Sequence, residues 1–473
     1  MRADTRDFIR SYSKAIIESN AAVFAGAGLS KPAGFVNWKE LLLEIAEDLS
    51  LDIDAESDLI SLAQYHVNER GRSKLNRIIM EEFTREGVAT DNHNILANLP
   101  IQTYWTTNYD SLIEDCLRQQ GRRIDVKITK ENLALTLPNR HATVYKMHGD
   151  KSFPNDAVIT RDDYEGYNQI RQPFTIALQG DLISKTFLFI GFSFDDPNLQ
   201  YILSRVRILL GENQRDHYCF MRKVAKSQFT NDEKYQHASV LQELRIKDLR
   251  RYRIHVVLVD EYEEITEILR ILAGIVLRTN VFVSGSAHEY GLWGEERAFN
   301  FANELGKVLI QHGYNIVTGF GLGIGSSLMS GALEEIYRNP HGIVEDRLLA
   351  RPFPQSNNSK ELWTRYRNDM ISKVGIAIFI FGNKKDHISG ETVPASGMVE
   401  EFNIAFENNV IPIPIATTGY TTKELWGKVK ENFDLYVHDK SLFPLYEKLE
   451  NEVLDNKQLI ELILVIIKKL ESV

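Results

Sequence analysis

The feature that most constrains this chain is a short apolar run that ends in a glycine-rich turn. Residues 21–30 read Ala-Ala-Val-Phe-Ala-Gly-Ala-Gly-Leu-Ser. The apolar run predicts a buried strand, and glycine lets a ligand approach the backbone closely. A strand, such a turn and a following helix are how open α/β sheets hold the diphosphate of a dinucleotide. Taken alone, the turn is equally compatible with an ordinary tight turn.

Strand-like runs alternate with helical segments through the first part of the chain. The further runs expected as strands cover residues 101–106, 144–147, 186–190, 217–221 and 254–259. Strands that alternate with helices predict a parallel sheet covered on both faces. Residues 55–98 are charged and helical in pattern, and they predict a helical insertion beside that sheet.

The same alternation starts again near residue 280. Strands are expected at residues 280–283, 315–317, 374–381 and 410–415. We therefore predict an α/β protein of two doubly wound, Rossmann-like domains, covering residues 1–277 and 278–473. No linker rich in Pro, Gly or Ser separates the halves, so we expect them to dock directly.

Composition excludes several classes of function. The net charge is −10 and there is no long basic run, which argues against a dedicated nucleic-acid surface. No apolar segment reaches the roughly 18 residues of a membrane span, and the N-terminal residues lack a signal-peptide core, so we expect a cytoplasmic protein. The two cysteines, Cys116 and Cys219, cannot form a four-cysteine zinc site, and no metal is expected.

Small or polar residues follow four strands of the first domain, at residues 26–30, 107–110, 148–149 and 191–196. Because ligands bind at the carboxyl ends of parallel strands, we expect these clusters to converge on one crevice. An amide such as Asn108 can hold a ribose hydroxyl and a water, and an imidazole such as His148 can accept a proton. Either residue alone is as readily a turn former or a structural side chain. Together they are our candidate catalytic residues.

In order and spacing these clusters resemble the NAD-binding domain of the sirtuins, over about residues 5–275. The motifs are Gly-Ala-Gly-Leu-Ser at 26–30, Thr-Asn-Tyr-Asp at 107–110, His-Gly at 148–149 and Gly-Phe-Ser at 191–193. The resemblance implies that His148 is the catalytic histidine and that Asn108 and Asp110 border the nicotinamide-ribose pocket. Asp110 is equally well explained as a helix cap. The residues implied in NAD binding are Ala25, Gly26, Ala27, Ser30, Asp110, Gly191 and Ser193.

The chain also departs from that family. Its protein deacylases carry two cysteine pairs that hold a structural zinc, and this chain cannot build that site. Residues 31–38 also lack the Asp-Phe-Arg that usually follows the glycine turn. Both departures favour cleavage of the nicotinamide–ribose bond with water as acceptor, so that NAD+ is the substrate and no cofactor is expected. An NAD-dependent protein deacylase and a non-catalytic nucleotide-binding module remain as alternatives.

The second domain contains a loop, residues 318–326, with four glycines at alternate positions before a helix. Such a loop presents N–H groups to an anion. With residues 281–286, 367–370 and 397–401, it resembles the SLOG superfamily, which includes LOG-type phosphoribohydrolases, over about residues 279–420. Residues 394–398 lack the double glycine and the threonine of the catalytic members, so the resemblance implies binding. The implied signal-binding residues are Gly285, Ser286, Gly321, Gly323, Arg367, Lys384, Gly397 and Glu400.

A sirtuin-like domain followed by a SLOG domain is similar to the effector NADases of Thoeris antiphage defence. That resemblance implies a sensor: a TIR-domain partner protein makes a cyclic ADP-ribose isomer, the SLOG domain binds it, and the first domain depletes NAD+ in abortive infection. An unrestrained NADase would kill its host, so we expect a resting off state in a homo-oligomer, a tetramer. The insertion at residues 55–98 is the element expected to move. The sequence leaves open whether Glu400 or Glu401 contacts the signal.

Overall fold

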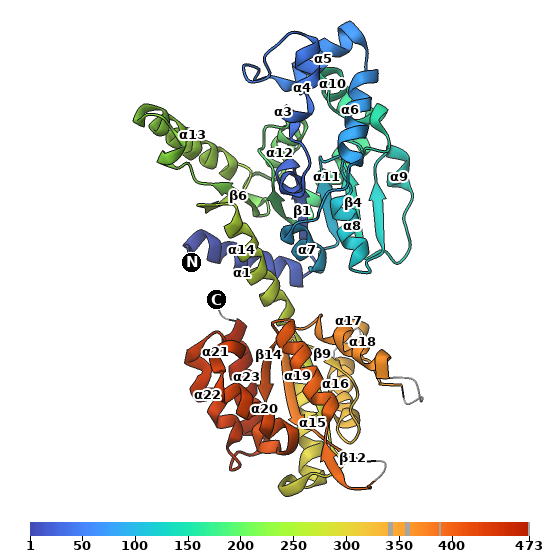
Figure 1. Cartoon of the computed structure of the whole chain (residues 1–473), viewed down its shortest axis with the longest axis vertical. Helices are drawn as coiled ribbons and strands as arrows, with labels where there is room; N and C mark the ends of the chain where they lie inside the picture. Colours follow the sequence, from blue (N-terminus) through green and yellow to red (C-terminus); the bar gives the residue numbers. More distant parts are fainter. Residues whose placement is uncertain (339–343, 355–359, 387–388, 472–473) are drawn as a thin grey trace. The chain divides into compact units, whose positions relative to one another are not determined.

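The computed structural model describes residues 1–338, 344–354, 360–386 and 389–471. It divides into two compact units, Met1–Ala273 and Gly274–Val473. Each unit contains a parallel β-sheet flanked by helices, which confirms the predicted class of two Rossmann-like α/β domains (Figure 1).

The sheet of the first unit has seven parallel strands in the order β3-β4-β2-β1-β5-β6-β7. The strands are β1 (Ala21–Ala25), β2 (Thr103–Thr106), β3 (Ile124–Lys127), β4 (Ala142–Lys146), β5 (Thr186–Ile190), β6 (His217–Arg222) and β7 (Ile254–Val259). All residues of β1 and β5 are buried, as expected where helices cover both faces of a sheet. Strand β3 was not expected from the sequence, because it has only four residues, is not continuously apolar and lies at the sheet edge.

The α-helices of the first unit fill the connections between these strands. They are α1 (Ala3–Ile17), α2 (Ala27–Ser30), α3 (Trp38–Leu41), α4 (Leu43–Asp48), α5 (Leu59–Arg70), α6 (Ser73–Thr84), α7 (Asp91–Asn98), α8 (Leu112–Gln119), α9 (Lys130–Ala134), α10 (Arg161–Ile170), α11 (Gln172–Ser184), α12 (Pro197–Leu210), α13 (Asp232–Arg250) and α14 (Glu263–Leu277), the last of which spans the division between the units.

The helices of the expected insertion share a hydrophobic core of their own. Its buried residues include Phe35, Leu42, Leu62 and Phe83, so the core draws in the chain N-terminal to residue 55. Tyr109, from the turn that follows β2, also packs in this core and connects the helices to the sheet edge. Helix α7, by contrast, lies against α8 beside the sheet.

The second unit has a five-stranded parallel sheet in the order β10-β9-β8-β11-β14 and a two-stranded antiparallel sheet, β12-β13. The strands are β8 (Asn280–Ser286), β9 (Asn315–Thr318), β10 (Leu348–Ala350), β11 (Ile376–Phe381), β12 (Asn383–Lys385), β13 (Thr392–Pro394) and β14 (Ile411–Pro414). Strands β10, β12 and β13 were not expected, because three residues are too few to show a period of two.

The α-helices of the second unit cover this sheet and extend to the end of the described chain. They are α15 (Glu295–Gln311), α16 (Gly325–Arg338), α17 (Val344–Arg347), α18 (Lys360–Ile371), α19 (Ser396–Glu407), α20 (Tyr420–Glu431), α21 (Phe433–Tyr436), α22 (Phe443–Glu447) and α23 (Asn456–Glu471).

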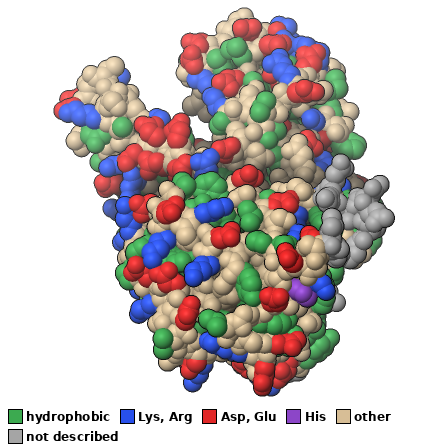
Figure 2. Space-filling model, turned by 60° about the horizontal axis from the view of Figure 1, so that its bottom comes forward, with side chains coloured by type: hydrophobic (Ala, Val, Ile, Leu, Met, Phe, Trp, Pro, Cys, Tyr) green, Lys and Arg blue, Asp and Glu red, His purple; other side chains and the backbone are tan. Residues whose placement is uncertain are grey.

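The surface mixes charges of both signs. Figure 2 shows acidic and basic side chains interspersed over the face in view. Within the described residues, no helix has the length and hydropathy that crossing a membrane requires. In the same part of the chain, no group of three or more His, Cys, Asp or Glu side chains is placed to hold a metal ion.

Candidate functional site

The four polar clusters of the first unit follow four strands that are neighbours in the sheet, β4, β2, β1 and β5. Thr106 of β2 is paired in register with Lys146 of β4. Asn108 and His148 each lie two residues beyond that pair, so both stand at the same edge of the sheet. Strand β2 lies on one side of β1 and β5 on the other, so the direction in which strands are added to the sheet reverses at β1. Open α/β sheets bind their ligands at such a reversal.

Asn108 is held by the turn that follows β1. Its Nδ2 donates to the carbonyl oxygen of Gly26 at 3.0 Å and to the hydroxyl of Ser30 at 2.9 Å. Its backbone N–H donates to the Thr106 hydroxyl at 2.9 Å. The side chain is buried, yet its Oδ1 has no hydrogen-bond partner. The amide is therefore fixed by its nitrogen and presents its oxygen as a free acceptor.

The two glycine turns pack backbone against backbone. The N–H of Gly26 donates to Ile190 and the N–H of Gly28 donates to Gly191, both at 2.9 Å. A Cβ on Gly26 would lie 2.4 Å from the Gly191 carbonyl oxygen, and Gly191 has a φ of +65°. These contacts require glycine at both positions, and they engage the Gly28 amide within the protein.

The other residues implied in NAD binding differ in accessibility. Ala25 is the buried last residue of β1, and Ala27 begins α2. Ser30 is buried beside Asn108, whereas Ser193 is exposed beyond the end of β5.

His148 is buried between aromatic rings and a carboxylate. Its ring meets Tyr164 edge-on at 5.5 Å and Tyr167 at 6.3 Å between centroids. Its Nε2 lies 3.2 Å from Oδ2 of Asp196, in ion-pair range but without an aligned hydrogen bond. Oδ1 of Asp196 accepts from the Leu199 N–H at 2.8 Å and so caps α12. Asp196 lies within the expected cluster at residues 191–196 but was not among the candidate site residues, although an Asp before a proline at a helix start is a recognisable cap signal.

Asp196 is ionised beside the imidazole. Burial pushes the pKa of this carboxyl upward, but the His148 imidazole and the hydrogen bonds from Leu199 and Tyr164 outweigh burial and bring the pKa below its ordinary value. The Tyr164 hydroxyl donates to the same Oδ2 at 3.3 Å.

A buried lysine lies beneath the candidate catalytic residues. The Lys146 ammonium group contacts Oδ2 of Asp150 at 2.5 Å, Oε1 of Glu114 at 3.1 Å and the Tyr109 carbonyl oxygen at 3.3 Å, and it also donates to the carbonyl oxygen of Asp110. Burial lowers the pKa of Lys146, but the two carboxylates raise it more and the net direction is upward. This charge fastens the turn after β2 to the turn after β4. The only sequence signal for it is a charged residue within an apolar strand.

Several polar atoms at this edge are buried without a hydrogen-bond partner. They are Oδ1 of Asn108, Oδ2 of Asp110, Nε2 of His148 and Nδ2 of Asn198. Leaving such a group without a partner costs about 1–3 kcal/mol of stability, so these atoms are candidates for contact with a ligand or with water. Oδ1 of Asp110 accepts from the Leu112 N–H at 3.0 Å, so one oxygen serves the start of α8 and the other is free. Asn198, in the first turn of α12, was not among the expected site residues.

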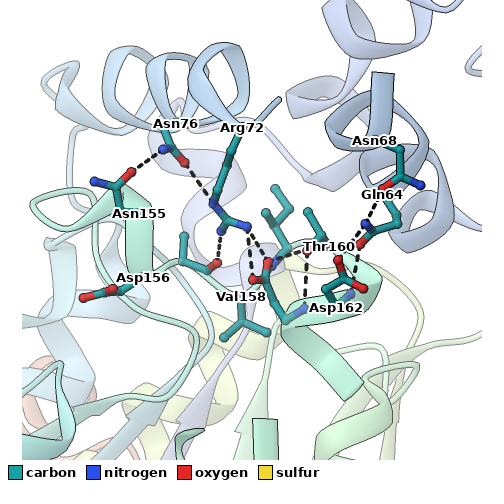
Figure 3. A network of polar contacts seen from close by, with 12 residues as sticks. Gln64, Asn68, Arg72, Asn76, Asn155, Asp156, Val158, Thr160 and Asp162 are labelled. Atoms are coloured by element: carbon teal, nitrogen blue, oxygen red, sulfur yellow. Dashed lines mark hydrogen bonds and ion pairs between the residues drawn. The ribbon is translucent and has the colours of Figure 1, made fainter. Parts of the chain in front are cut away.

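A polar network joins the helical core to the segment that follows His148 (Figure 3). Arg72 makes two hydrogen bonds to Asp163, at 3.0 and 2.9 Å, and donates to the Ala157 carbonyl oxygen. Two further pairs link the same segments: Asn76 with Asn155, and Gln64 with Asp162. Val158, the residue after Ala157, donates its N–H to the His148 carbonyl oxygen at 2.8 Å. These hydrogen bonds connect the helices to the segment whose backbone bonds to His148.

In the second unit, a buried arginine occupies the corresponding edge. Arg367 donates to Glu400 at 2.7 Å, and its Nε lies 3.4 Å from Glu401. Its guanidinium carbon sits 4.9 Å from the centre of the Phe353 ring. Glu401 is turned inward and accepts from the Ser284 hydroxyl at 2.6 Å, and burial raises its pKa. The Glu400 side chain is 38% exposed against 9% for Glu401, so Glu400 is the more accessible of the two carboxylates.

Three glycines of the second unit are closely packed, one of them against this arginine. A Cβ on Gly397 would lie 2.6 Å from the Arg367 guanidinium, and one on Gly321 would lie 1.9 Å from the Gly285 carbonyl oxygen. A Cβ on Gly323, whose φ is +82°, would lie 1.9 Å from a backbone oxygen of the loop after β8.

The remaining expected signal-binding residues also follow strand ends of this sheet. Ser286 ends β8, and its carbonyl oxygen accepts from the Gly382 N–H at 3.0 Å. Lys384, on β12, is exposed and donates to the Ser396 hydroxyl at 3.3 Å.

Two family models match the chain. The SIR2-like domain matches residues 102–248, and the Sir2- and TIR-associating SLOG family matches residues 264–470. The fold and the two strand edges thus define a SIR2-like domain joined to a SLOG domain, which confirms both resemblances seen in the sequence.

Full-length relatives define the family. The chain is 47% identical to the NAD(+) hydrolase ThsA of Bacillus cereus (strain MSX-D12), over 98% of both chains. It is 49% identical to that of Acinetobacter baumannii (strain 532279), over 93% of this chain and 94% of the relative, and 48% identical to that of Cytobacillus dafuensis, over 93% and 91%. The chain belongs to the ThsA family.

Proposed function

We propose that this chain hydrolyses NAD+ to nicotinamide and ADP-ribose at the strand edge of its first unit. Its relatives are named NAD(+) hydrolases. The observation that carries the assignment to this edge is the buried Oδ1 of Asn108, which has no hydrogen-bond partner, together with the buried His148, whose Nε2 meets the Asp196 carboxylate without an aligned hydrogen bond; the two residues follow neighbouring strands.

The reaction has simple chemical needs. As nicotinamide leaves, the ribose carbon of the broken bond gains oxocarbenium character, and water adds there. Oδ1 of Asn108 accepts a hydrogen bond from a ribose hydroxyl or from the water. The imidazole of His148 takes the proton that the water releases, and the Asp196 carboxylate stabilises the resulting imidazolium. The balance is NAD+ and water to ADP-ribose, nicotinamide and one proton.

Lys146 supports this reaction by positioning the two candidate catalytic residues. Positioning two groups around one reacting carbon needs supports that do not move. By binding backbone carbonyl oxygens of the β2 turn and the Asp150 carboxylate of the β4 turn, Lys146 fixes the distance between the two turns.

We further propose that the SLOG domain controls this activity. Asn108 is 8% exposed and His148 is 2% exposed, so NAD+ gains access only when the surroundings open. The proposed signal is a cyclic ADP-ribose isomer made by a TIR-domain partner protein. Its phosphates would compete with Glu400 for the Arg367 guanidinium. To carry the protein from mostly off to mostly on, the signal must bind the active state about 10⁴-fold more tightly than the resting state.

The biological setting completes the proposal. We propose that the protein acts as a homo-oligomer, a tetramer, and that NAD+ depletion serves antiphage defence by abortive infection. The helices linked through Arg72 to the segment after His148 support a route by which an opening movement reaches the site.

The test is a product assay. The full chain is incubated with NAD+, alone and with a panel of cyclic ADP-ribose isomers, and nicotinamide and ADP-ribose are separated by chromatography. We expect one isomer to raise the rate at least about 100-fold, which is within the range of allosteric coupling. An absence of NAD+ cleavage under every condition would contradict the proposed activity.

A further inference from the structure

Two tyrosines of α10 face the candidate catalytic histidine. A capping box starts this helix: the Thr160 hydroxyl accepts from the Asp163 N–H at 3.3 Å, and the Asp163 carboxylate accepts from the Thr160 N–H at 2.8 Å. Tyr164 and Tyr167 follow three residues apart, a spacing that puts both side chains on one side of a helix. Both rings meet the imidazole of His148 edge-on.

The hydroxyl groups of the two tyrosines have different partners. Tyr167 donates to the Met147 carbonyl oxygen at 3.1 Å. Tyr164 donates to Oδ2 of Asp196 at 3.3 Å, and the same oxygen lies 3.2 Å from Nε2 of His148. One carboxylate oxygen therefore joins the tyrosine hydroxyl to the imidazole, and of the two tyrosines it is Tyr164 that contacts it.

The Asp196 carboxylate is attached at both of its oxygens. Oδ1 accepts from the Leu199 N–H at 2.8 Å, at the start of α12. The terminal torsion of an aspartate is soft, so this hydrogen bond alone leaves the other oxygen free to turn. The Tyr164 hydroxyl supplies the second point of attachment and thereby determines where Oδ2 lies.

Tyr164 is itself a donor with a fixed place. Its ring packs edge-on against Trp38 of α3 at 6.3 Å between centroids. The preceding residue, Asp163, is held by two hydrogen bonds from Arg72, at 3.0 and 2.9 Å. Burial and the neighbouring Asp196 charge raise the pKa of Tyr164 well above its ordinary value, so the hydroxyl keeps its proton. It therefore acts as a hydrogen-bond donor to the carboxylate.

We propose that Tyr164 is a positioning residue, whose hydroxyl holds Oδ2 of Asp196 beside Nε2 of His148. The three side chains then form a Tyr–Asp–His chain of polar contacts. The inference rests on the proposed hydrolysis of NAD+, in which the Asp196 carboxylate stabilises the imidazolium of His148. Without the hydroxyl, the carboxylate turns away and this stabilisation is lost.

Removing one oxygen atom tests the role. Tyr164→Phe deletes the hydroxyl and keeps the ring. In the product assay described above, we expect kcat to fall about tenfold to hundredfold, the size expected for a hydrogen bond to a charged group. KM should change by less than about threefold, because the contact acts on the reacting state. The matched control is Tyr12→Phe, which deletes a buried hydroxyl that donates to the Ala22 carbonyl oxygen at 2.8 Å, and it should retain full activity.

The pH profile separates positioning from a loss of packing. The titratable groups that face Asp196 are His148, Tyr109, Tyr164 and Tyr167. Burial raises the pKa of all three tyrosines, so they stay neutral on the acid side of the profile. The hydrogen bond from Tyr164 lowers the pKa of Asp196, so its loss raises that pKa, and Tyr164→Phe should lose activity at a higher pH than the unmodified chain. Tyr167→Phe should keep the acid limb in place, and an equal shift in both variants would overturn the proposal.

A double-mutant cycle asks whether Tyr164 acts through Asp196. Asp196→Asn removes the charge and keeps a residue that caps helices well, so the start of α12 is preserved. Adding Tyr164→Phe to this variant should lower kcat by less than about twofold more, because the group that Tyr164 positions is already gone. A further loss as large as that of Tyr164→Phe alone would show that the two residues act independently, and would overturn the proposal.

A crystal structure of the full-chain Tyr164→Phe variant tests the positioning apart from the activity. We expect the Asp196 carboxylate to turn until both oxygens lie beyond about 4 Å from Nε2 of His148, outside ion-pair range. An Oδ2 that stays at 3.2 Å would overturn the inference. A turned carboxylate in a protein whose unmodified form cleaves no NAD+ would support the positioning of Asp196 and overturn the proposed hydrolysis, so the two failures are distinguishable.

Discussion

The carboxyl ends of the strands carry similar glycine turns in the two units, but the polar side chains beside those turns have different partners. Each has glycine turns that pack backbone against backbone beyond parallel strands. In the first unit, Oδ1 of Asn108 is a buried acceptor without a hydrogen-bond partner, whereas in the second Arg367 donates to Glu400 and its Nε lies 3.4 Å from Glu401. Free acceptors suit a site that takes part in a reaction. A cation already bound by carboxylates suits a site where a ligand must displace one of them and so changes the protein.

The largest effect is expected when the polar side chains of Asn108 and His148 in the first unit are removed. Asn108→Ala and His148→Ala are each expected to lower the rate of NAD+ hydrolysis about 10²–10⁴-fold, because general-base catalysis and positioning contribute that much. Signal binding by the second unit, measured by calorimetry, should not change.

The control for the histidine is His438→Ala, which removes an exposed imidazole in the second unit and should retain full activity. Wild-type rates from both Asn108→Ala and His148→Ala would show that the strand edge is not where the bond breaks.

Removing Lys146, which connects the turns after β2 and β4, is expected to have nearly as large an effect. Lys146→Met leaves Glu114 and Asp150 as uncompensated buried carboxylates and should cost about 3–5 kcal/mol of stability. Adding Glu114→Gln should recover part of the stability but not the turnover, because the turns remain unfastened. Denaturant unfolding and kcat are the measurements, and full turnover in a folded Lys146→Met protein would refute the positioning role.

Removing the Arg367 guanidinium of the second unit should separate signal binding from NAD+ hydrolysis. Arg367→Ala is expected to weaken signal binding about tenfold to hundredfold, the value of a charged hydrogen-bonded contact, and to abolish stimulation. Basal hydrolysis should persist. Arg365→Ala, which removes an exposed arginine two residues away, should be stimulated normally. A fully stimulated Arg367→Ala protein would place the signal elsewhere.

The smallest expected effect concerns acid stability of the first unit. Burial lowers the pKa of His93 from 6.5 to about 4. Between those values the unfolded chain binds the proton and the folded chain does not, so stability falls as pH decreases from 6.5 towards 4. His93→Gln should flatten the dependence of unfolding free energy on pH in that window. An unchanged slope would mean that His93 does not contribute to it.

Local patterns in the sequence were enough for most of the fold. The buried strands, the glycine turns and the polar clusters at strand ends are each written in a few consecutive residues. Strands β3 and β10 were missed because they are short and lie at sheet edges. The assignment of Asn108 and His148 as catalytic rests on clusters that the fold brings to one edge, and it stays a prediction.

The contacts that hold the site were harder to see. Lys146 acquires its meaning from Glu114 and Asp150, and Asp196 from His148, and only the fold brings these groups together. Likewise, the sequence offers two adjacent glutamates, and only the fold shows that Glu401 is buried and accepts from the Ser284 hydroxyl while Glu400 is the more exposed.

The most direct measurement is a structure of the full chain with a non-hydrolysable NAD+ analogue and the activating nucleotide. The account predicts Oδ1 of Asn108 and the imidazole of His148 within hydrogen-bond reach, about 3 Å, of the ribose or of a water beside its anomeric carbon. An analogue bound away from these two side chains would contradict it.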